Sequence, residues 1–423
     1  MNNNKIAALA VGLAGLLAQS PALAETRIAM WVHSGAGPEA DAYAASADAF
    51  NAGSADIKID LVRLPEGSYG NQISAAALAR KLPCVLEFDG PNVYNYAWSK
   101  KIVPLDGYPE LARLKDSLLP SLQQQGTYAG RLYTLAQFDS GLAIWGNRKL
   151  LTQAGVRIPA GLDDAWKLDE FETALVRLKQ AGVPYPLDMK FNYGVGEWSS
   201  YGFAPIVQSF GGDLIERVQL RRATGLLNGE ASVKALTALQ GWIKAGYVNA
   251  ATKDDSDFVK GRAALSYVGH WVYRDYRKAL GSDLVLIPMP RFGARAVTAA
   301  GSWNLGISSD CKSPEAAAKV LAFLMTPAEI NRITDANGAI PATTEALAAS
   351  RDYRDGGPLR LYVEQLRRIA VVRPKTPAYP AISGAFAEAL NNIAAGADVK
   401  HELDRAAKKI DENIEDNKGY VVR

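Results

Sequence analysis

Three apolar stretches decide the fold of this chain: IAMWV at residues 28–32, IKIDLVRL at residues 57–64 and CVLEF at residues 84–88. Each has the pattern of a β-strand. The segments between them have helical spacing, with Tyr43, Ala47 and Phe50 on one face of the first and a second helix expected over residues 71–81. Strand, helix, strand, helix, strand within about 65 residues predicts the opening of a parallel, doubly wound α/β sheet.

The loops at one end of this sheet are candidates for a binding site. In such sheets, ligands bind outside the carboxyl ends of the strands. The loops that begin at His33, Glu66 and Asp89 each follow a predicted strand. We therefore expect side chains from these loops to gather at the same edge.

Length and composition bound the possible functions. The chain has 423 residues, enough for two or three compact units. Lys plus Arg total 47 and Asp plus Glu total 44, and a balance this even gives no indication of a surface that binds nucleic acid. Three His and two Cys exclude a His- or Cys-rich metal cluster. The 8 Trp and 18 Tyr outnumber the 11 Phe, which favours surfaces that meet amphipathic ligands.

Residues 1–24 predict a secretory signal peptide. Lys5 precedes an apolar run at 6–18, and Ala22, Leu23 and Ala24 supply a small-x-small pattern before Glu25. The run is too short for a bilayer, which needs about 20 helical residues, and no Cys follows it to carry a lipid. We expect cleavage after Ala24 and a soluble periplasmic protein without a membrane anchor.

Taken in order, the motifs of the mature chain resemble those of the periplasmic sugar-binding proteins that serve ABC importers, the family of maltose-binding protein. The resemblance covers nearly the whole mature chain. It is carried by IAMW (28–31), LPCVL (82–86), IVPLD (102–106), YTL (133–135), LLTQAG (150–155), FGG (210–212), FVKGRAA (258–264) with GHW (269–271), GSW (301–303), and RP (373–374) through YP (379–380). The FVKGRAA and GHW pair is the most specific segment.

This resemblance implies the two-lobed, type II periplasmic binding protein fold. Each lobe would be an α/β unit with a central, mostly parallel sheet flanked by helices, and the lobes would close on a ligand by hinge motion. Lobe 1 is expected to comprise residues 25–136 and 302–348, and lobe 2 residues 139–300 and 349–423. Hinge crossings are expected near residues 135–140 and 298–303, with a third after the helix that contains Phe323.

The resemblance also predicts a disulfide. The family usually has Asp at the position of Cys84. If the strand order matches the family, Cys84 opens one strand and Cys311 ends its antiparallel neighbour. An oxidising periplasm permits a bond between them. The alternative is two unrelated buried thiols.

A sugar site needs aromatic platforms for C–H faces and polar side chains for hydroxyls. Trp271 in the GHW motif is the first candidate platform and Trp303 at the second crossing is another, with a place in the core as the alternative. Asp89 and Asp139 are candidates for binding hydroxyls, with the capping of turns as the alternative. Trp198 would either form part of the wall in the second lobe or pack inside it.

Three further candidates complete the predicted substrate-binding set. Arg373 is the cationic candidate, with a surface ion pair as the alternative. His33 follows the first strand, where a lone His is also compatible with no function. Ser68, with Tyr69 and Asn92, is a weaker candidate after the second strand.

We therefore expect a periplasmic receptor that captures a small sugar or glycoside in an interlobe cleft and delivers it to an ABC transporter permease. We expect a monomer without a cofactor, a metal or a catalytic residue. No Gly-x-x-x-x-Gly-Lys loop is present for ATP hydrolysis.

Several alternatives stay open. An anionic sugar derivative, sulfonated or phosphorylated, is one, because Arg373 near the cleft favours a neutral or anionic ligand. A polyamine would need several acidic groups around an aromatic box, and ferric iron a Tyr pair, for which Tyr94 and Tyr96 give weak support. A periplasmic glycoside hydrolase is the remote alternative, since it needs two carboxylates flanking one bond, and no Gly-x-Ser-x-Gly or His-Glu-x-x-His motif points to another enzyme.

Overall fold

The structure is a computed structural model that describes residues 25–35 and 37–421. The predicted signal peptide at residues 1–24 lies outside this range. Within the described ranges, no helix combines the length and apolarity that crossing a bilayer requires.

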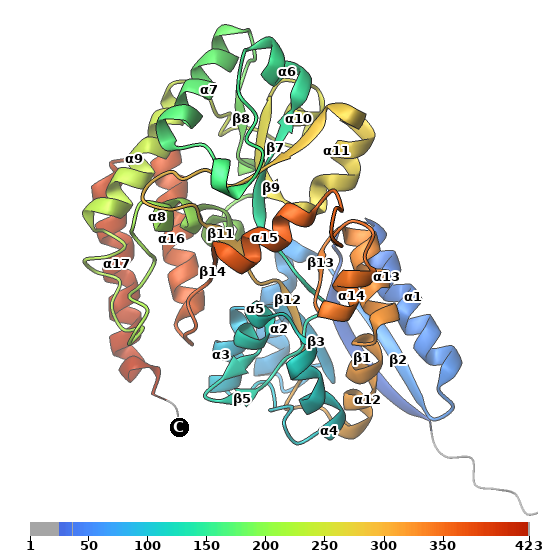
Figure 1. Ribbon diagram of the computed structural model, residues 1–423. Helices are drawn as coiled ribbons and strands as arrows, with labels where there is room; N and C mark the ends of the chain where they lie inside the picture. The colour runs from blue at the N-terminus through green and yellow to red at the C-terminus, as the bar shows by residue number, and fades with distance from the viewer. Residues whose placement is uncertain (1–24, 36, 422–423) are drawn as a thin grey trace, which may run out of the picture.

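The sheet of the first lobe has the strand order β12-β3-β1-β2. Its members are β1 (Thr26–His33), β2 (Ile57–Leu64), β3 (Val85–Asp89) and β12 (Trp303–Ile307). β1 runs parallel to β2 and to β3, while β12 pairs with β3 in the antiparallel direction. The predicted parallel opening of the fold is therefore present, and a strand that returns from the second half of the chain extends it (Figure 1).

Helices surround this sheet in the lower lobe of Figure 1. They are α1 (Gly37–Gly53), α2 (Glu66–Leu78), α3 (Asn92–Trp98), α4 (Pro109–Ala112), α5 (Pro120–Gln125), α12 (Pro314–Leu324), α13 (Pro327–Asn337) and α14 (Thr344–Ala349). The helix expected over residues 71–81 begins earlier, because Pro65 occupies its N-cap and its backbone conformation fits a helix entry.

The sheet of the second lobe differs from the expected, mostly parallel arrangement. Its order is β10-β7-β9-β8, with β7 (Leu142–Asn147), β8 (Leu187–Asp188), β9 (Leu265–Gly269) and β10 (Leu284–Ile287). β9 and β10 both pair with β7 in the antiparallel direction, and only β8 and β9 are parallel. The reason is topological: β7 leaves the hinge and enters the lobe, whereas β9 and β10 run back toward the hinge.

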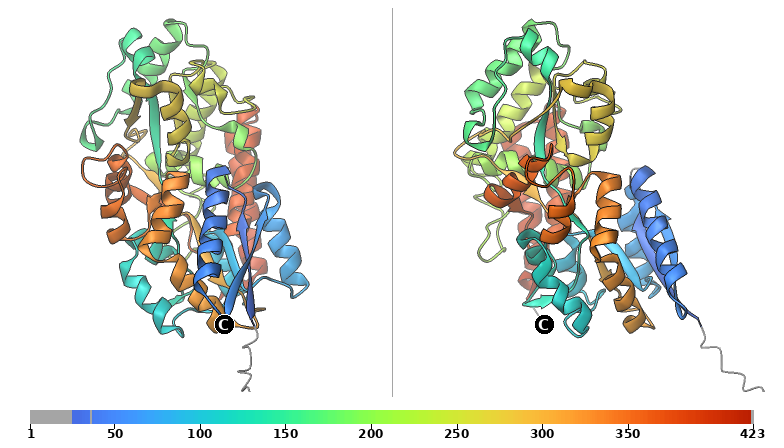
Figure 2. Two further views of the ribbon diagram at one scale, coloured as in Figure 1. Left: turned by 90° about the vertical axis from the view of Figure 1, so that its right-hand side faces the viewer. Right: turned by 45° about the vertical axis from the view of Figure 1, so that its right-hand side comes forward.

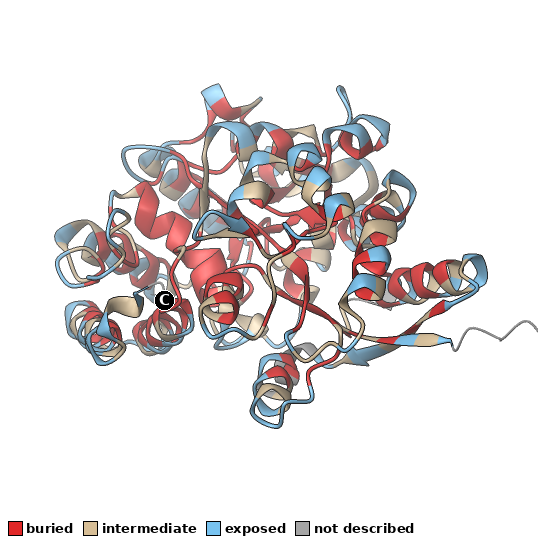
Figure 3. Ribbon diagram, turned by 90° about the horizontal axis from the view of Figure 1, so that it is seen from below, coloured by how far each residue is buried: buried red, intermediate tan, exposed pale blue. Residues whose placement is uncertain are grey.

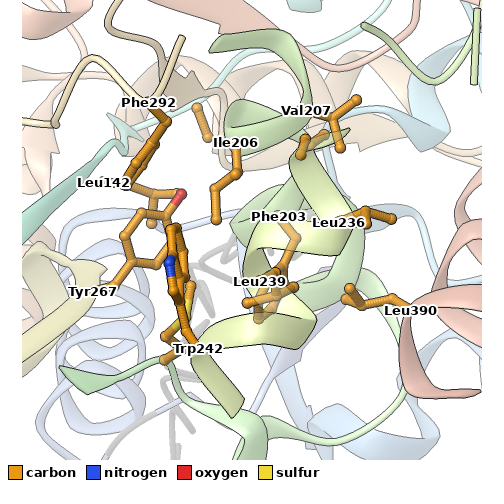
Figure 4. Close-up of a cluster of buried hydrophobic side chains, with 14 of the residues drawn as sticks. Leu142, Phe203, Ile206, Val207, Leu236, Leu239, Trp242, Tyr267, Phe292 and Leu390 are labelled. Atoms are coloured by element: carbon orange, nitrogen blue, oxygen red, sulfur yellow. The ribbon is translucent and has the colours of Figure 1, made fainter. Parts of the chain in front are cut away.

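Helices of 4 to 18 residues surround the second sheet. They are α6 (Arg148–Gln153), α7 (Leu168–Gln180), α8 (Ala204–Ser209), α9 (Glu230–Lys244), α10 (Ser256–Val259), α11 (Tyr273–Leu280), α15 (Arg360–Arg368), α16 (Tyr379–Ala394) and α17 (Val399–Asp416). Figure 4 shows how Trp242 of α9, Tyr267 of β9 and Leu390 of α16 enter one apolar core. Seen from below in Figure 3, the helices turn their buried faces inward and their exposed faces to solvent, as amphipathic helices do.

Short paired strands accompany the connections between the lobes. β6 (Phe138–Asp139) pairs with β13 (Ile340–Pro341), and β11 (Thr298–Ala300) pairs with β14 (Ala370–Val372). Leu135 still bridges to Leu305 of the first sheet, whereas Leu142 already belongs to the second. The two views of Figure 2 show the lobes one above the other with these connections between them. A small hairpin of β4 (Thr127–Tyr128) and β5 (Arg131–Leu132) lies in the first lobe.

The two cysteines form the predicted disulfide. Cys84 lies directly before β3 and Cys311 follows β12, and their Cα atoms are 4.3 Å apart. The bond spans 227 residues of sequence and ties the ends of two neighbouring strands together. Both residues pack against the apolar core of the first lobe.

Candidate functional site

Three of the predicted residues meet at one edge of the first sheet. His33 ends β1, Asp89 ends β3, and Trp303 begins β12. Because β12 runs antiparallel to β3, Trp303 is the direct register partner of Asp89. The His33 imidazole stacks on the Trp303 indole, with ring centroids 3.8 Å apart and planes 3° from parallel. The residues after β1 and β3 therefore meet at one edge of this sheet, and their contact with a ligand stays a prediction.

Aromatic side chains of the second lobe gather after β9. Trp271 lies two residues beyond the end of β9, with its ring centroid 6.1 Å from Trp198 and 6.2 Å from Tyr201. Its indole N–H donates a hydrogen bond of 3.0 Å to the Tyr193 hydroxyl. A Cβ atom at Gly269 would lie 2.0 Å from the Trp271 ring, so this ring position requires glycine.

Arg373 joins the two lobes. Its guanidinium binds the Asp89 carboxylate with two bonds of 2.7 and 2.8 Å and donates a third of 2.6 Å to Glu197 of the second lobe. The guanidinium carbon lies 5.0 Å from the centre of the Tyr201 ring. The side chain is 4% exposed, and none of the described residues accepts a hydrogen bond from its Nε–H. Arg373 is thus a buried bridge and not the surface ion pair that was its alternative.

Residues of α16 complete the setting of Glu197. Tyr379 donates a hydrogen bond to one Glu197 oxygen, and Ser383 donates one of 2.8 Å to the other. Burial lowers the pKa of Arg373, but the neighbouring Asp89, Tyr379 and Glu197 raise it well above its usual value. The guanidinium therefore stays charged, and both carboxylates have a cation between them.

His33 belongs to a second charged group. Its Nδ1 lies 2.7 Å from a Glu87 oxygen, and its Nε2 lies 3.6 Å from Glu39 at the start of α1. Tyr43 donates to the other Glu87 oxygen. Although burial alone lowers the pKa of His33, Glu87 and Glu39 raise it well above the ordinary value. The imidazole therefore favours its charged form, fixed by carboxylates on both ring nitrogens.

His270 approaches the same Glu39 from the second lobe. It follows β9 and is 3% exposed, and its ring lies against the backbone of Asn337 and Gly338 at the end of α13. Burial lowers the pKa of His270 to about 4, against the opposing effect of Glu39. Its ring centroid lies 5.3 Å from that of Trp271. His270 is therefore a neutral histidine beside a carboxylate of the other lobe.

These contacts close into a circuit that we call the interlobe ring. Each member touches, pairs with or interacts electrostatically with the next, and the last returns to the first: Trp303, His33, Glu39, His270, Trp271, Tyr201, Arg373 and Asp89. Four members come from the first lobe, three from the second, and Arg373 from the connection between β14 and α16. The ring combines aromatic faces with carboxylates and a fixed cation, which is a chemistry for binding a polar ligand with apolar faces.

The structure gives Asp139 a different setting from the other candidates. It is fully buried on β6, and its carboxylate accepts hydrogen bonds from Ser121, from the Ser140 N–H at 2.7 Å and from the Gly301 N–H at 2.8 Å. Burial raises the pKa of Asp139. Because Asp139 and Gly301 lie on the two predicted crossings, this carboxylate holds the crossings together, and its contact with a ligand stays a prediction.

The remaining predicted residues lie in different settings. Ser68 falls within α2, but its side chain lies outside the part of the chain that the structure describes. Tyr69 is buried beside the interlobe ring, and the centroid of its phenol ring lies 5.8 Å from that of the Trp303 indole. Tyr94 and Tyr96 lie on α3 and pack separately, against Tyr128 and Phe88, which does not support the iron alternative.

Sequence reasoning missed four members or partners of the ring: Glu39, Glu197, Tyr201 and His270. Glu197 and Tyr201 lie within three residues of Trp198, and His270 lies within the GHW motif, so three of them are close in sequence to a predicted aromatic residue. A polar residue next to a predicted aromatic platform was the available signal. Glu39 gave no signal beyond its place in the first turn of α1.

Two surface pockets lie away from the interlobe ring. The larger, of about 260 Å³, lies beside α7 and is lined in part by Arg157 and Glu170, which pair with each other at 3.0 Å. The other, of about 230 Å³, is lined in part by Arg291 and Arg368, and Arg368 pairs with Asp163. Neither includes a member of the interlobe ring.

The fold agrees with comparisons to known proteins. The family model described as bacterial extracellular solute-binding protein matches residues 45–356. This chain belongs to that family. The match includes every strand of the second sheet, β2, β3 and β12 of the first sheet, and five of the eight members of the interlobe ring.

Several solved structures share the fold over nearly the whole chain. The GacH receptor of Streptomyces glaucescens, solved unliganded and with acarbose, is 21% identical with a TM-score of 0.78, covering 93% of this chain and 98% of that one. A substrate-binding protein from Listeria monocytogenes in complex with cycloalternan is 19% identical with a TM-score of 0.79, covering 92% and 99%. A solute-binding protein from Thermotoga lettingae bound with alpha-D-tagatose is 18% identical, also with a TM-score of 0.79, covering 92% and 99%.

Proposed function

We propose that this solute-binding protein captures a small sugar or glycoside between its lobes and delivers it to the membrane permease of an ABC importer. The observation that carries the proposal is the interlobe ring, because it places aromatic faces from both lobes and carboxylates from the first lobe in one circuit. Sugars need that combination, since their C–H faces are apolar and their hydroxyls need directional partners. Acarbose, cycloalternan and tagatose in structures of the same fold support a carbohydrate ligand.

Capture would be coupled to closure. A ligand that contacts both lobes stabilises the closed arrangement by its greater affinity for that state. Trp303 and Asp89 would serve from the first lobe, and Trp271 and Tyr201 from the second. The permease would then recognise the closed shape, and ATP hydrolysis would come from another subunit.

The setting of Arg373 bears on the charge of the ligand. Its terminal nitrogens already bind Asp89 and Glu197. For an anionic glycoside to bind there, it would have to displace a carboxylate, whereas a neutral sugar would use carboxylate lone pairs that the guanidinium leaves free. This favours the neutral sugar, and the sulfonated or phosphorylated glycoside stays as the second candidate. We propose no enzymatic reaction.

A thermal-shift screen of the mature protein tests the proposal. The panel contains neutral sugars, polyols, anionic glycosides, polyamines and ferric citrate, and a ligand of the native state raises the melting temperature. We expect the largest shift from a glycoside and expect Trp271→Ala and Trp303→Ala to abolish it. Trp98→Ala is the matched control, because Trp98 packs against Tyr420, away from the ring. A shift only with polyamine or iron would overturn the sugar assignment.

Export and oligomeric state belong to the same proposal. The mature protein would begin at Glu25 in the periplasm and act as a monomer, because both lobes must face the permease. N-terminal sequencing of the exported protein checks the first point. Light scattering checks the second, and a mass near twice that of the chain would contradict it.

A further inference from the structure

We propose that Lys190 is a positioning residue of the interlobe site, which orients the Trp271 and Trp198 indoles through the turn that it fixes. This turn, at residues 189–193, directly follows the short strand β8. The orientation of the indoles is a property of the protein without ligand. Its consequence for binding rests on the proposed function, in which Trp271 is a platform for the sugar.

The Lys190 side chain is fully buried between two carboxylates. It is 0% exposed, and its Nζ lies 2.8 Å from an Asp188 oxygen and 2.9 Å from an Asp255 oxygen. The centroid of the Tyr276 ring lies 5.3 Å from the same Nζ. Burial lowers the pKa of Lys190, but Asp188 and Asp255 raise it above its ordinary value. The charged ammonium therefore ties the end of β8 to the segment before α10.

Stability alone does not account for this arrangement. Lys190 has φ 57° and ψ 41°, in the left-handed region that is costly for a residue with a side chain. Taking an ammonium and a carboxylate out of water is also costly, and an apolar group often serves a core equally well. Strained backbone that persists against such costs is concentrated at ligand-binding sites.

The ammonium and the backbone of the turn belong to one network. The Lys190 N–H donates a hydrogen bond of 3.0 Å to the other Asp188 oxygen, and the Lys190 carbonyl accepts one of 3.0 Å from the Tyr193 N–H. Asn192 donates a bond of 2.9 Å to the same Asp255 oxygen that binds the Lys190 ammonium. Removing the charge would therefore loosen the turn as a whole.

The turn holds each of the two indoles by its N–H group. The Trp271 N–H donates a hydrogen bond of 3.0 Å to the Tyr193 hydroxyl, and the Trp198 N–H donates one of 3.3 Å to the Met189 carbonyl. The two indole planes stand at 87° to each other. Because an indole has a single N–H donor, each bond fixes the rotation of its ring. Loss of the turn would release both indoles at once.

Fluorine NMR of the ligand-free, mature protein labelled with 5-fluorotryptophan tests the positioning. Trp271→Phe and Trp198→Phe assign two of the signals from the 8 tryptophans. We expect Lys190→Met to shift or broaden both assigned signals. Tyr193→Phe deletes only the hydroxyl that accepts the Trp271 bond, and it should move the Trp271 signal. Unchanged Trp271 and Trp198 signals in folded Lys190→Met would overturn the proposal.

Lys179→Met is the matched control. Lys179 donates to the backbone carbonyls of Pro184 and Gly246 at the other end of β8, so its loss should leave both indole signals in place. Circular dichroism establishes that each variant is folded. If Lys190→Met is not, Asp255→Asn replaces it, because the Asp255 side chain is half exposed and belongs to the same network. Unchanged signals in that variant would overturn the proposal equally.

Calorimetry with the panel sugar that gives the largest thermal shift tests the consequence for binding. A ligand that must order two released indoles binds more weakly, so we expect Lys190→Met to raise the dissociation constant about tenfold. Lys179→Met should keep the wild-type value. Wild-type affinity in Lys190→Met with displaced indoles would overturn the role in binding. Failure of every sugar to bind would overturn the proposed function, while the fluorine spectra would still decide the positioning of the indoles.

Discussion

At the residue scale, Gly269 sets the position of the Trp271 ring. A methyl group there would meet the ring at 2.0 Å, so we expect Gly269→Ala to displace Trp271 and abolish the ligand-induced thermal shift. Gly241→Ala is the control, because Gly241 lies in α9, where a Cβ atom meets no atom within 4 Å. Alanine should stabilise that helix by about 0.5–1 kcal/mol. A full thermal shift in Gly269→Ala would remove Trp271 from the site.

Arg373 is the residue whose loss should cost most stability. Arg373→Met leaves Asp89 and Glu197 without a cation between them, and breaking a buried pair in this way costs about 3 kcal/mol. Arg405→Met removes a half-exposed partner of Glu388 and should cost less than about 1 kcal/mol. Urea unfolding of both variants measures the difference. Equal costs would contradict the view that Arg373 holds the lobes together.

His33 predicts a pH dependence of stability. The pKa of His33 is raised in the folded state. Its contribution to the free energy of unfolding is therefore complete below its ordinary pKa, near 6.5, and disappears as the pH rises through its pKa in the folded protein. We expect the difference in the free energy of unfolding between wild type and His33→Gln to shrink as the pH is raised from 6 to 9. Denaturant titrations at fixed pH measure it. A difference that grows with pH would show that His33 is neutral in the folded protein.

The residue scale is also where sequence reasoning reached its limit. His33 and Asp89 could be predicted because each follows a strand at the same sheet edge, and Trp303 because the family resemblance places it at a crossing. Glu39 could not be predicted, because its role depends on contacts with distant segments, which no local pattern records. Glu197 and His270 were signalled only by their position next to predicted aromatic residues. Asp139 shows the converse: its position on a crossing was clear, but its three hydrogen-bond donors come from separate segments.

At the element scale, the disulfide ties β3 to β12. A bond that closes so long a loop stabilises the native state by roughly 2–5 kcal/mol in the chain-entropy description. We expect the double variant Cys84→Ala, Cys311→Ala to lose stability in that range, measured by urea unfolding of oxidised wild type and variant. Two free thiols in denatured, unreduced protein, or equal stability of the two proteins, would contradict the prediction.

The elements themselves were predictable where their pattern is strong. β1, β2 and β3 and the helices between them follow from periodicity alone, and the family resemblance placed Cys84 beside Cys311. The direction of β9 and β10 was not predictable, because a strand pattern carries no information about which way the strand runs. The start of α2 was also missed, since Pro65 acts through backbone conformation and not through apolar periodicity.

At the scale of the whole molecule, the two-lobed fold was predicted from the order of the family motifs along the chain. The matched family and the shared folds agree with that expectation. The lobe boundaries at residues 136–139, 300–302 and 348–349 stay predictions. Motion of the lobes would be restricted, because any bending must occur around two short ribbons, in which β6 pairs with β13 and β11 pairs with β14.

The disulfide has a consequence for the integrity of the receptor outside the cell. Cys84 and Cys311 close a covalent loop of the chain, and every strand of the second sheet lies on that loop. A protease that cuts one peptide bond of the second lobe within residues 139–300 therefore leaves both fragments attached to each other. Such a nicked molecule would migrate as a single species in a denaturing gel without reductant and separate into two when thiol is added. The two fragments would thus stay together after such a cut in the second lobe, since the disulfide prevents either from diffusing away from the other.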